Sequence, residues 1–531
     1  SIHLLTMNKE EPARIDKVFK GTIVHSLGWD SGLPDGGFQI IHDALVGVNN
    51  KGRIAFIGDA AHDNDLAQTF HFNYNQVIEL GNRFLIPGFV DTHIHAPQYA
   101  FAGTGNDLQL LEWLNRYTFP TESKFQDTEF AKRVYTKAVE RSLFSGTTTA
   151  CYFATIHLPP TLTLVDVIGK LGQRALVGKV CMDRNSPDFY RETTEGSIKA
   201  TQEFVDRVLQ VNNPLIKPVI TPRFVPTCTG ELMRGIADIA HNHSLPIQSH
   251  VSENKGEIAW VKELHPDISS YTEVYDKYGL LTSQTLLAHA IYLSDHELHL
   301  FKERDAGICH CPVSNFSLNS GILDARRVID AQVKLGLGTD VSGGYSSSIL
   351  EVIRQSVTAS KSIQMQHPKP SEYKVLTYKE AFSLATLGGS QVLSLQDKIG
   401  NFVPGKDFDA LIINPHSEGS PFDVFEIDTF DDIFQKFIFL GDDRNIEEIF
   451  VAGKTIFHPD SAEALHRKKR KAEAEVTASP TVTRSTPKPV KSEATEQPSS
   501  FSFSSSVYPL ALIGLSAAAL LTVKLFLQRK A

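Results

Sequence analysis

The chain has 531 residues, of which 41% are apolar and 21% are charged, a composition that suits several folded domains and excludes a wholly disordered protein. The formal net charge is −9, and residues 1–458 alone carry 41 basic and 55 acidic side chains, a net charge of −14. Because binding to a polynucleotide needs a basic surface, this acidic balance argues against a nucleic-acid partner.

Cysteine usage and the first residues bear on the cellular compartment. Five cysteines are an odd and sparse set, unlike a disulfide framework. Residues 1–20 are too charged to contain the continuous apolar core of a secretory signal. We therefore expect the folded region to lie in the reducing environment of the cytoplasm.

Both ends of the folded region are rich in β-strand patterns. Near the start, the turn sequence at residues 49–52 separates two apolar, β-branched runs, as in a hairpin. The same strand-like pattern of apolar, β-branched residues recurs at residues 410–413 and 449–457. We therefore expect residues 1–84 and residues 396–458 to form the two parts of one small β-sandwich.

The region between these ends, residues 85–395, alternates short apolar runs with longer helical patterns. One helix is predicted at residues 130–144, with Phe130, Val134 and Ala138 on one face and Gly146 just beyond its end. Eight strands are predicted, at residues 85–91, 147–153, 175–180, 217–221, 246–249, 285–288, 307–310 and 333–338. Eight strand–helix alternations predict an α/β fold, a (β/α)8 TIM-like barrel whose functional site lies where the strands end.

The composition changes after residue 458. Among residues 477–506, 18 of 30 are Ser, Thr or Pro, which predicts a disordered linker over residues 459–506. Residues 507–527 contain one charge, Lys524, and as a helix would measure about 31 Å, close to the hydrocarbon thickness of a bilayer. We expect a C-terminal apolar helix there that spans a membrane, with packing on the barrel or on a partner as the alternative.

Ionisable side chains stand at the ends of the predicted barrel strands. His93 and His95 end the first strand, and in an extended chain both project from one face, so that both imidazoles can reach one metal ion. His250, His289 and Asp340 end three further strands. Each residue alone has an ordinary explanation, such as a loop hydrogen bond or a helix N-cap. Together they predict a divalent metal, because burial of so much unpaired charge would be costly.

Five segments of the sequence resemble the amidohydrolase superfamily of metal-dependent hydrolases, and within it the guanine deaminases. They are residues 87–99, 221–224, 250–253, 310–315 and 338–340. The resemblance covers roughly residues 15–458 and does not include the tail. It implies a barrel with a flanking β-sandwich, one Zn²⁺ per chain, a homodimer, and the hydrolytic conversion of guanine to xanthine and ammonia.

Carried over residue by residue, the resemblance assigns roles to individual side chains. The zinc ligands would be His93, His95, His250 and Asp340. Glu253 would be the proton shuttle, His289 a nearby assistant, and Asp340 the group that takes the proton of the attacking water. The substrate contacts would be His95, Ala96, Pro97, Gln98, Arg223, Phe224, His250, Glu253 and Asp340.

The chemistry of guanine agrees with these residue types. The Arg223 fork suits the O6 and N7 acceptors, the Gln98 amide can serve N1–H and O6, and Phe224 can stack on the purine face. Two alternatives stay open: an aminohydrolase of the same fold that acts on another heterocycle, such as a triazine, cytosine or an adenosine derivative, and a membrane-tethered, non-catalytic scaffold. The presence of every expected ligand disfavours the scaffold.

Overall fold

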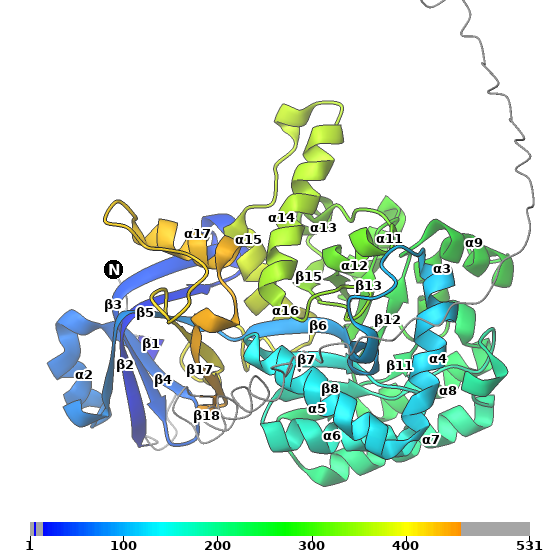
Figure 1. Ribbon diagram of the computed structural model, residues 1–531, viewed down its shortest axis with the longest axis horizontal. Coiled ribbons are helices and arrows are strands. Elements are labelled where there is room, and N and C mark those ends of the chain that lie inside the picture. The colour runs from blue at the N-terminus through cyan, green and yellow to red at the C-terminus, as the bar shows by residue number, and fades with distance from the viewer. Residues whose placement is uncertain (1–4, 7–13, 458–531) are drawn as a thin grey trace, which may run out of the picture. The chain divides into compact units, whose positions relative to one another are not determined.

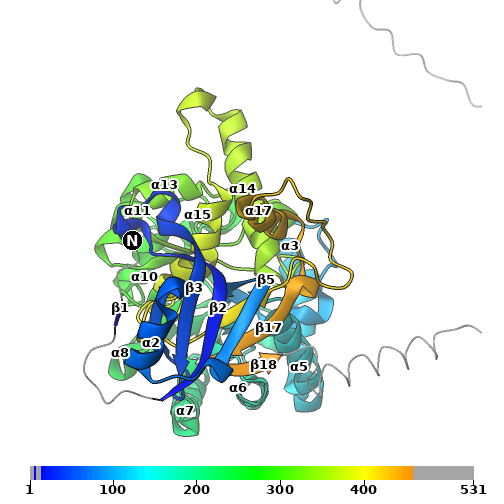
Figure 2. The same cartoon turned by 90° about the vertical axis from the view of Figure 1, so that its left-hand side faces the viewer.

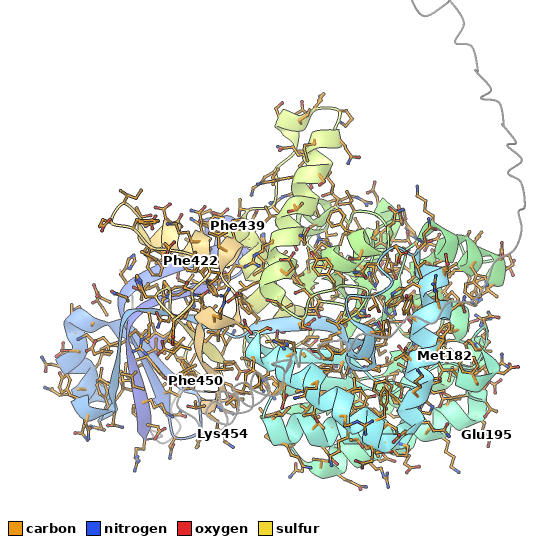
Figure 3. The ribbon with its side chains drawn as sticks, in the orientation of Figure 1. Met182, Glu195, Phe422, Phe439, Phe450 and Lys454 are labelled. Carbon is orange, nitrogen blue, oxygen red and sulfur yellow. The ribbon has the colours of Figure 1, made fainter. Side chains whose placement is uncertain are left out.

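The computed structural model describes residues 5–6 and 14–457 of the chain. These residues form a β-sheet unit and a larger unit of alternating strands and helices, which lie side by side (Figure 1). Phe450 lies within the sheet unit and Met182 within the larger unit (Figure 3). The predicted linker at residues 459–506 and the predicted apolar helix at residues 507–527 lie outside the described residues.

The sheet unit is built from both ends of the folded region, as predicted (Figure 2). It is one eight-stranded sheet in the order β1-β4-β3-β2-β5-β16-β17-β18, rather than two separately paired sheets. The physical reason is that β5 pairs on both edges, in parallel with β2 and antiparallel with β16. Its strands are β1 (Leu5–Thr6), β2 (Ile15–Ser26), β3 (Phe38–Asn49), β4 (Ile54–Asp59), β5 (Val77–Pro87), β16 (Ala410–Ile413), β17 (Ile446–Val451) and β18 (Lys454–Phe457).

Turn chemistry and aromatic packing stabilise this sheet. The predicted hairpin is confirmed as β3–β4, where the Asn49 side chain accepts hydrogen bonds from the backbone N–H groups of Lys51 and Arg53. On one face of the sheet, the rings of Phe19 and Phe408 stack with their centroids 5.0 Å apart.

The larger unit contains parallel strands only, in three ladders of order β10-β8-β7-β6, β11-β9 and β12-β13-β14-β15. Backbone hydrogen bonds join these ladders, among them one from the Gln248 N–H to the Ile220 carbonyl at 2.9 Å and one from the Asp340 N–H to the His93 carbonyl at 2.8 Å. The arrangement is barrel-like, although the ladders do not merge into one continuous eight-stranded sheet. The strands are β6 (Phe89–His95), β7 (Thr147–Phe153), β8 (Arg174–Gly178), β9 (Val180–Cys181), β10 (Ile216–Pro218), β11 (Thr221–Pro222), β12 (Ile247–Val251), β13 (Thr285–His289), β14 (Gly307–His310) and β15 (Lys334–Leu337).

Three predicted strands are divided in the structure, because residues 175–180 correspond to β8 and β9, residues 217–221 to β10 and β11, and residues 85–91 to β5 and β6. Residues 85–91 were expected to form a single strand, but β5 ends at Pro87 and β6 begins at Phe89. Gly88 lies between them, packed so closely that a Cβ would lie 2.1 Å from the Thr148 hydroxyl. The chain therefore passes at Gly88 from the sheet unit into the barrel-like unit.

Helices surround the parallel strands. The longer helices of this unit are α5 (Thr128–Phe144), α6 (Leu158–Leu171), α7 (Thr194–Val211), α8 (Gly230–His243), α9 (Lys255–Leu264), α10 (Tyr271–Lys277), α11 (Asp295–Glu303), α12 (Pro312–Ser317), α13 (Ala325–Asp330), α14 (Ile349–Gln366) and α15 (Tyr378–Ser383). Shorter or peripheral helices are α1 (Pro34–Gly37), α2 (Asp63–Phe70), α3 (Leu110–Trp113), α4 (Phe119–Glu122), α16 (Gly389–Val392) and α17 (Phe430–Leu440). Within the described ranges, no helix has the length and apolarity that a membrane crossing needs.

The predicted helix at residues 130–144 is confirmed as α5, which begins earlier. The Asp127 carboxylate accepts hydrogen bonds from the backbone N–H groups of Glu129 and Phe130, and this N-cap moves the start to Thr128. Its buried side includes Ala131, Tyr135, Ala138, Val139 and Leu143. The predicted face was thus displaced, since Phe130 and Val134 are only partly buried.

Candidate active site

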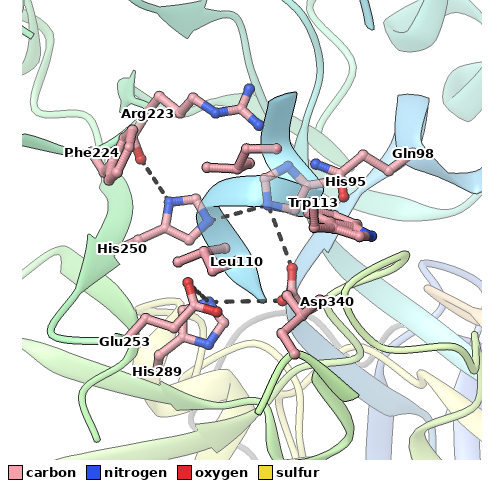
Figure 4. A pocket seen from close by; sticks show the side chains of 12 residues that line it. His95, Gln98, Leu110, Trp113, Arg223, Phe224, His250, Glu253, His289 and Asp340 are labelled. Atoms are coloured by element: carbon pink, nitrogen blue, oxygen red, sulfur yellow. Dashed lines mark hydrogen bonds and ion pairs between the residues drawn. The ribbon is translucent and has the colours of Figure 1, made fainter. Parts of the chain in front are cut away.

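The residues predicted to transfer protons and three of the predicted metal ligands converge around one pocket (Figure 4). His95 ends β6, His250 lies in β12, and Glu253 follows β12. His289 ends β13, and Asp340 follows β15. The carboxyl ends of parallel strands therefore bring together residues that are far apart in the sequence.

A buried carboxylate, Asp91, fixes the segment that carries His93. Asp91 accepts hydrogen bonds from the backbone N–H of His93 at 3.1 Å, the backbone N–H of Thr339 at 3.0 Å and the Thr339 hydroxyl at 2.5 Å. A Cβ on Gly338 would lie 2.9 Å from the His93 Cβ, so only glycine allows this approach. Asp91 thus holds the end of β6 against the segment that leads to Asp340.

The ligand atoms of the four predicted metal ligands lie in two overlapping close groups. The Nε2 atoms of His95 and His250 lie 3.2 Å apart. Asp340 Oδ1 lies 3.2 Å from His93 Nε2 and 3.5 Å from His95 Nε2. His93 belongs to two groups whose ligand atoms all lie within 4.8 Å of one another, one with His95 and His250 and one with His289 and Asp340.

The protonation of these histidines suits a metal. Burial lowers the pKa of His93, His95 and His250, which favours neutral imidazoles with a free lone pair. The Nδ1–H of His250 donates to the Arg223 carbonyl at 2.6 Å, and this leaves Nε2 as the ligand atom. Among the described residues, His93 Nδ1 has no hydrogen-bond partner, a costly state for a buried group, and His93 Nε2 faces the Asp340 carboxylate at 3.2 Å. Three histidines and one carboxylate therefore fit a divalent metal such as zinc.

Glu253 and His289 form a buried acid–base pair beside these ligands. Glu253 Oε2 lies 3.5 Å from His289 Nε2, and Glu253 Oε1 accepts a hydrogen bond from the Ser320 hydroxyl at 3.2 Å. Burial raises the pKa of Glu253 to about 7, although His289 opposes the shift. Near neutral pH, this carboxyl group is able both to accept and to donate a proton.

The charges of His289 and Asp340 stabilise each other. Burial disfavours the charged form of His289, but the carboxylates of Glu253 and Asp340 outweigh it and raise the pKa of His289. Burial also disfavours ionisation of Asp340, yet the histidines around it hold its pKa well below the usual value. The His289 Nδ1–H faces Asn315 Oδ1 at 2.9 Å, so that Nε2 points to the two carboxylates.

The predicted substrate contacts divide into two groups. Gln98, Arg223 and Phe224 line the pocket, as do His95, His250, Glu253 and Asp340. Ala96 and Pro97 are buried in the 3-10 helix Ala96–Phe101 and are not among the lining residues. The apolar part of the lining also includes residues that the sequence analysis did not single out, namely Leu110, Trp113, Leu114 and Leu318.

Glu122 and Asp91 also contribute to the site and were not singled out from the sequence. The buried Glu122 carboxylate accepts hydrogen bonds from both Arg223 and Gln98, although Glu122 itself does not line the pocket. No motif marks Glu122, and the only signal was indirect, because a buried arginine needs a nearby carboxylate.

Comparison with known proteins identifies the family. Residues 84–456 match the amidohydrolase family. The guanine deaminase of Dictyostelium discoideum is 51% identical over 452 residues, which cover 83% of this chain and 98% of that protein. The guanine deaminase of Mus musculus is 52% identical over 446 residues, which cover 83% and 96%. A crystal structure of guanine deaminase from C. acetobutylicum with bound guanine in the active site has a TM-score of 0.75 and 37% identity, covering 83% of this chain and 100% of that one. The chain therefore belongs to the amidohydrolase family and, within it, to the guanine deaminases.

Proposed function

We propose that the chain catalyses the hydrolytic deamination of guanine to xanthine and ammonia. The observation that carries this proposal is one pocket in which Glu253 and the ligand cluster face Arg223 and Gln98. The first set supplies hydrolytic chemistry, and the second supplies donors and an acceptor for the O6 and N1 edge of a purine. The family of the chain supports the same assignment.

The ligands of the metal would be His93, His95, His250 and Asp340, with one Zn²⁺ per chain. When bound, zinc would act as a Lewis acid that makes a nucleophilic water available at neutral pH. With three neutral histidines and one ionised carboxylate as ligands, a divalent ion would keep a net positive charge. That charge would stabilise an electron-rich nucleophile.

The two carboxylates would divide the proton transfers. As water adds to C2 of guanine, Asp340 takes its proton, and Glu253 donates a proton to N3 while the C2=N3 bond opens. Glu253 then takes the proton of the new C2 hydroxyl group and delivers it to the exocyclic amine, and the proton held by Asp340 returns to Glu253 at the end of the cycle. The C2–N bond breaks, ammonia leaves and a C2 carbonyl forms, which gives xanthine. The pKa of Glu253, raised to about 7, suits a group that must both accept and donate protons.

His289 would assist without transferring a proton to the substrate. Its Nε2 lies 3.5 Å from Glu253 Oε2 and 3.7 Å from Asp340 Oδ2. A protonated imidazole at this place orients both carboxylates and offsets negative charge that develops during the addition.

Recognition of guanine would depend on the other wall of the pocket. The Arg223 guanidinium would donate to O6 and N7, Gln98 would contact N1–H and O6, and Phe224 would stack on the purine. A panel of heterocyclic amines, assayed for ammonia release by the full-length chain, tests the proposal. Guanine should be turned over far faster than cytosine, adenosine and aminotriazines, and a preference for any of these would contradict the assignment.

We also propose that the chain lies in the cytoplasm, tethered to a membrane by residues 507–527, and that it forms the homodimer implied by its family resemblance. The apolar length of this segment, and the basic run at residues 467–471 that would be attracted to anionic lipid, support the tether. The full chain should then resist alkaline carbonate extraction of membranes, and recovery in the soluble fraction would refute the tether. Analytical ultracentrifugation of detergent-solubilised protein should show two chains per particle, and one chain would refute the dimer.

A further inference from the structure

We infer that Glu122 is a positioning residue that sets the specificity of the pocket by fixing the donors and acceptors of Gln98 and Arg223. The inference rests on the proposed deamination of guanine. Glu122 is the last residue of α4, in the segment between β6 and β7, and its side chain is fully buried. It lies behind the two residues that would contact the base.

All four acceptor positions of the Glu122 carboxylate are used. Oε1 accepts from Gln98 Nε2 at 3.0 Å and from Arg223 at 3.3 Å. Oε2 accepts from Arg223 at 2.7 Å and from the Tyr190 hydroxyl at 2.7 Å. A carboxylate with two oxygens offers about four such positions, so the network is complete. One buried group therefore connects the segments after β6, β9 and β11.

The orientation of the Gln98 amide follows from its two partners. Its NH₂ group must face the Glu122 carboxylate, because a carboxylate only accepts. Its carbonyl oxygen accepts from the backbone N–H of Ser342 at 3.2 Å. The oxygen keeps a second lone pair, so Gln98 presents an acceptor to the base and matches the N1–H of guanine.

The orientation of Arg223 is fixed in the same way. The Glu122 carboxylate accepts one hydrogen bond from each of the two terminal nitrogens of Arg223. The ring of Phe119, also in α4, lies 5.2 Å from the guanidinium carbon. Burial disfavours the charge of Arg223, but Glu122 outweighs this effect and raises its pKa. The remaining N–H groups stay available as donors for O6. An acceptor at Gln98 beside a donor at Arg223 is the complement of N1–H beside C6=O.

A simple buried ion pair would explain only part of this arrangement. Charge balance requires a carboxylate near Arg223, but it does not require the same carboxylate to hold Gln98. The pair of Arg326 and Glu380 is a matched buried pair outside the candidate active site, since Arg326 donates to both Glu380 oxygens at 2.8 and 2.7 Å, Glu380 is 1% exposed, and both residues line a different pocket. Glu380→Gln is therefore the control for the loss of a buried charge.

The test compares guanine with 2-aminopurine, which keeps the reacting amine at C2 but has no O6 and presents an acceptor at N1. In full-length Glu122→Gln, kcat/KM for guanine should fall about ten- to hundredfold, mainly through KM, because hydrogen bonds to a charged group are lost. The value for 2-aminopurine should change less than about threefold, because a freed Gln98 amide can turn its NH₂ to N1. The guanine preference should therefore collapse, while in Glu380→Gln it should stay unchanged.

Further variants separate positioning from folding. Tyr190→Phe removes one hydrogen bond to Glu122 and should shift the guanine preference in the same direction by a smaller factor. In an Arg223→Ala background, Glu122→Gln should lower the guanine preference by less than it does alone, because Glu122 can then position only Gln98. A parallel loss for both substrates, or an unchanged preference in folded Glu122→Gln and Tyr190→Phe, would overturn the inference. If the wild-type chain did not deaminate guanine, the proposed function itself would fail.

Discussion

Glu253→Gln separates proton transfer from folding and metal binding. Glu253 is 4% exposed, with one oxygen 3.2 Å from the Ser320 hydroxyl and the other 3.5 Å from His289 Nε2. Glutamine has nearly the same size and can still accept from Ser320, but it cannot exchange a proton. General acid–base catalysis contributes about 10²–10⁴-fold, so the barrier should rise by about 3–5 kcal/mol. The variant should bind metal like the wild type and lose turnover by this factor.

The assay is the initial rate of xanthine and ammonia formation at saturating guanine, with bound metal measured on the same sample. Glu257→Gln is the matched control, since Glu257 is also buried and accepts from the backbone N–H of Glu253 at 3.0 Å, but it does not line the pocket. It should lower kcat far less than Glu253→Gln does. A metal-loaded Glu253→Gln enzyme with kcat within about threefold of the wild type would refute the role of this residue as proton shuttle.

Three further predictions concern metal binding, specificity and stability. His93→Ala should lose both the bound metal and turnover, and a variant that kept both would contradict the ligand assignment. Arg223→Ala should lower kcat/KM for guanine about ten- to hundredfold, as expected for hydrogen bonds of roughly 1.5–3 kcal/mol, and unchanged kinetics would place Arg223 outside recognition. Burial lowers the pKa of His25 from 6.5 to about 4, so on acidification the unfolded chain binds a proton that the folded chain excludes. Unfolding free energy should therefore fall by about 2 kcal/mol more between pH 7 and pH 5 in the wild type than in His25→Gln, measured by denaturant titration, and equal losses would contradict this.

The central chemistry of the site could be predicted because strand ends carry a strong local signal. An extended chain places His93 and His95 on one face, and parallel strands gather His250, His289 and Asp340 at one edge. The structure brings these five side chains together. The buried strands are short apolar runs, and most were found within a few residues of their bounds.

The supporting network could not be predicted, because its contacts join loops that are distant in the chain. Glu122 lies 24 residues from Gln98, 68 from Tyr190 and 101 from Arg223. A single glutamate at the end of a four-residue helix has no periodicity that would distinguish it from a solvent-exposed one. Trp113 was missed for a related reason, since an apolar residue that lines a pocket looks like a core residue in sequence.

The division between β5 and β6 could not be predicted from the sequence either. Residues 85–91 form one apolar run, so local pattern alone predicts one strand. The break at Gly88 arises because the preceding residues pair with β16, more than 300 residues later in the chain, whereas Phe89 and its successors pair with β7. Long-range pairing decides such a boundary.

Metal titration of the full-length chain tests the central claim most directly. The chain is stripped with a chelator and reconstituted with increasing zinc, and bound metal and guanine-to-xanthine turnover are measured in each sample. Zinc-dependent deamination by this site predicts no turnover without metal, a rise in turnover in proportion to bound zinc, and saturation at one ion per chain. Full turnover by the metal-free chain, or no deamination of guanine by a chain that holds one zinc ion, would contradict it.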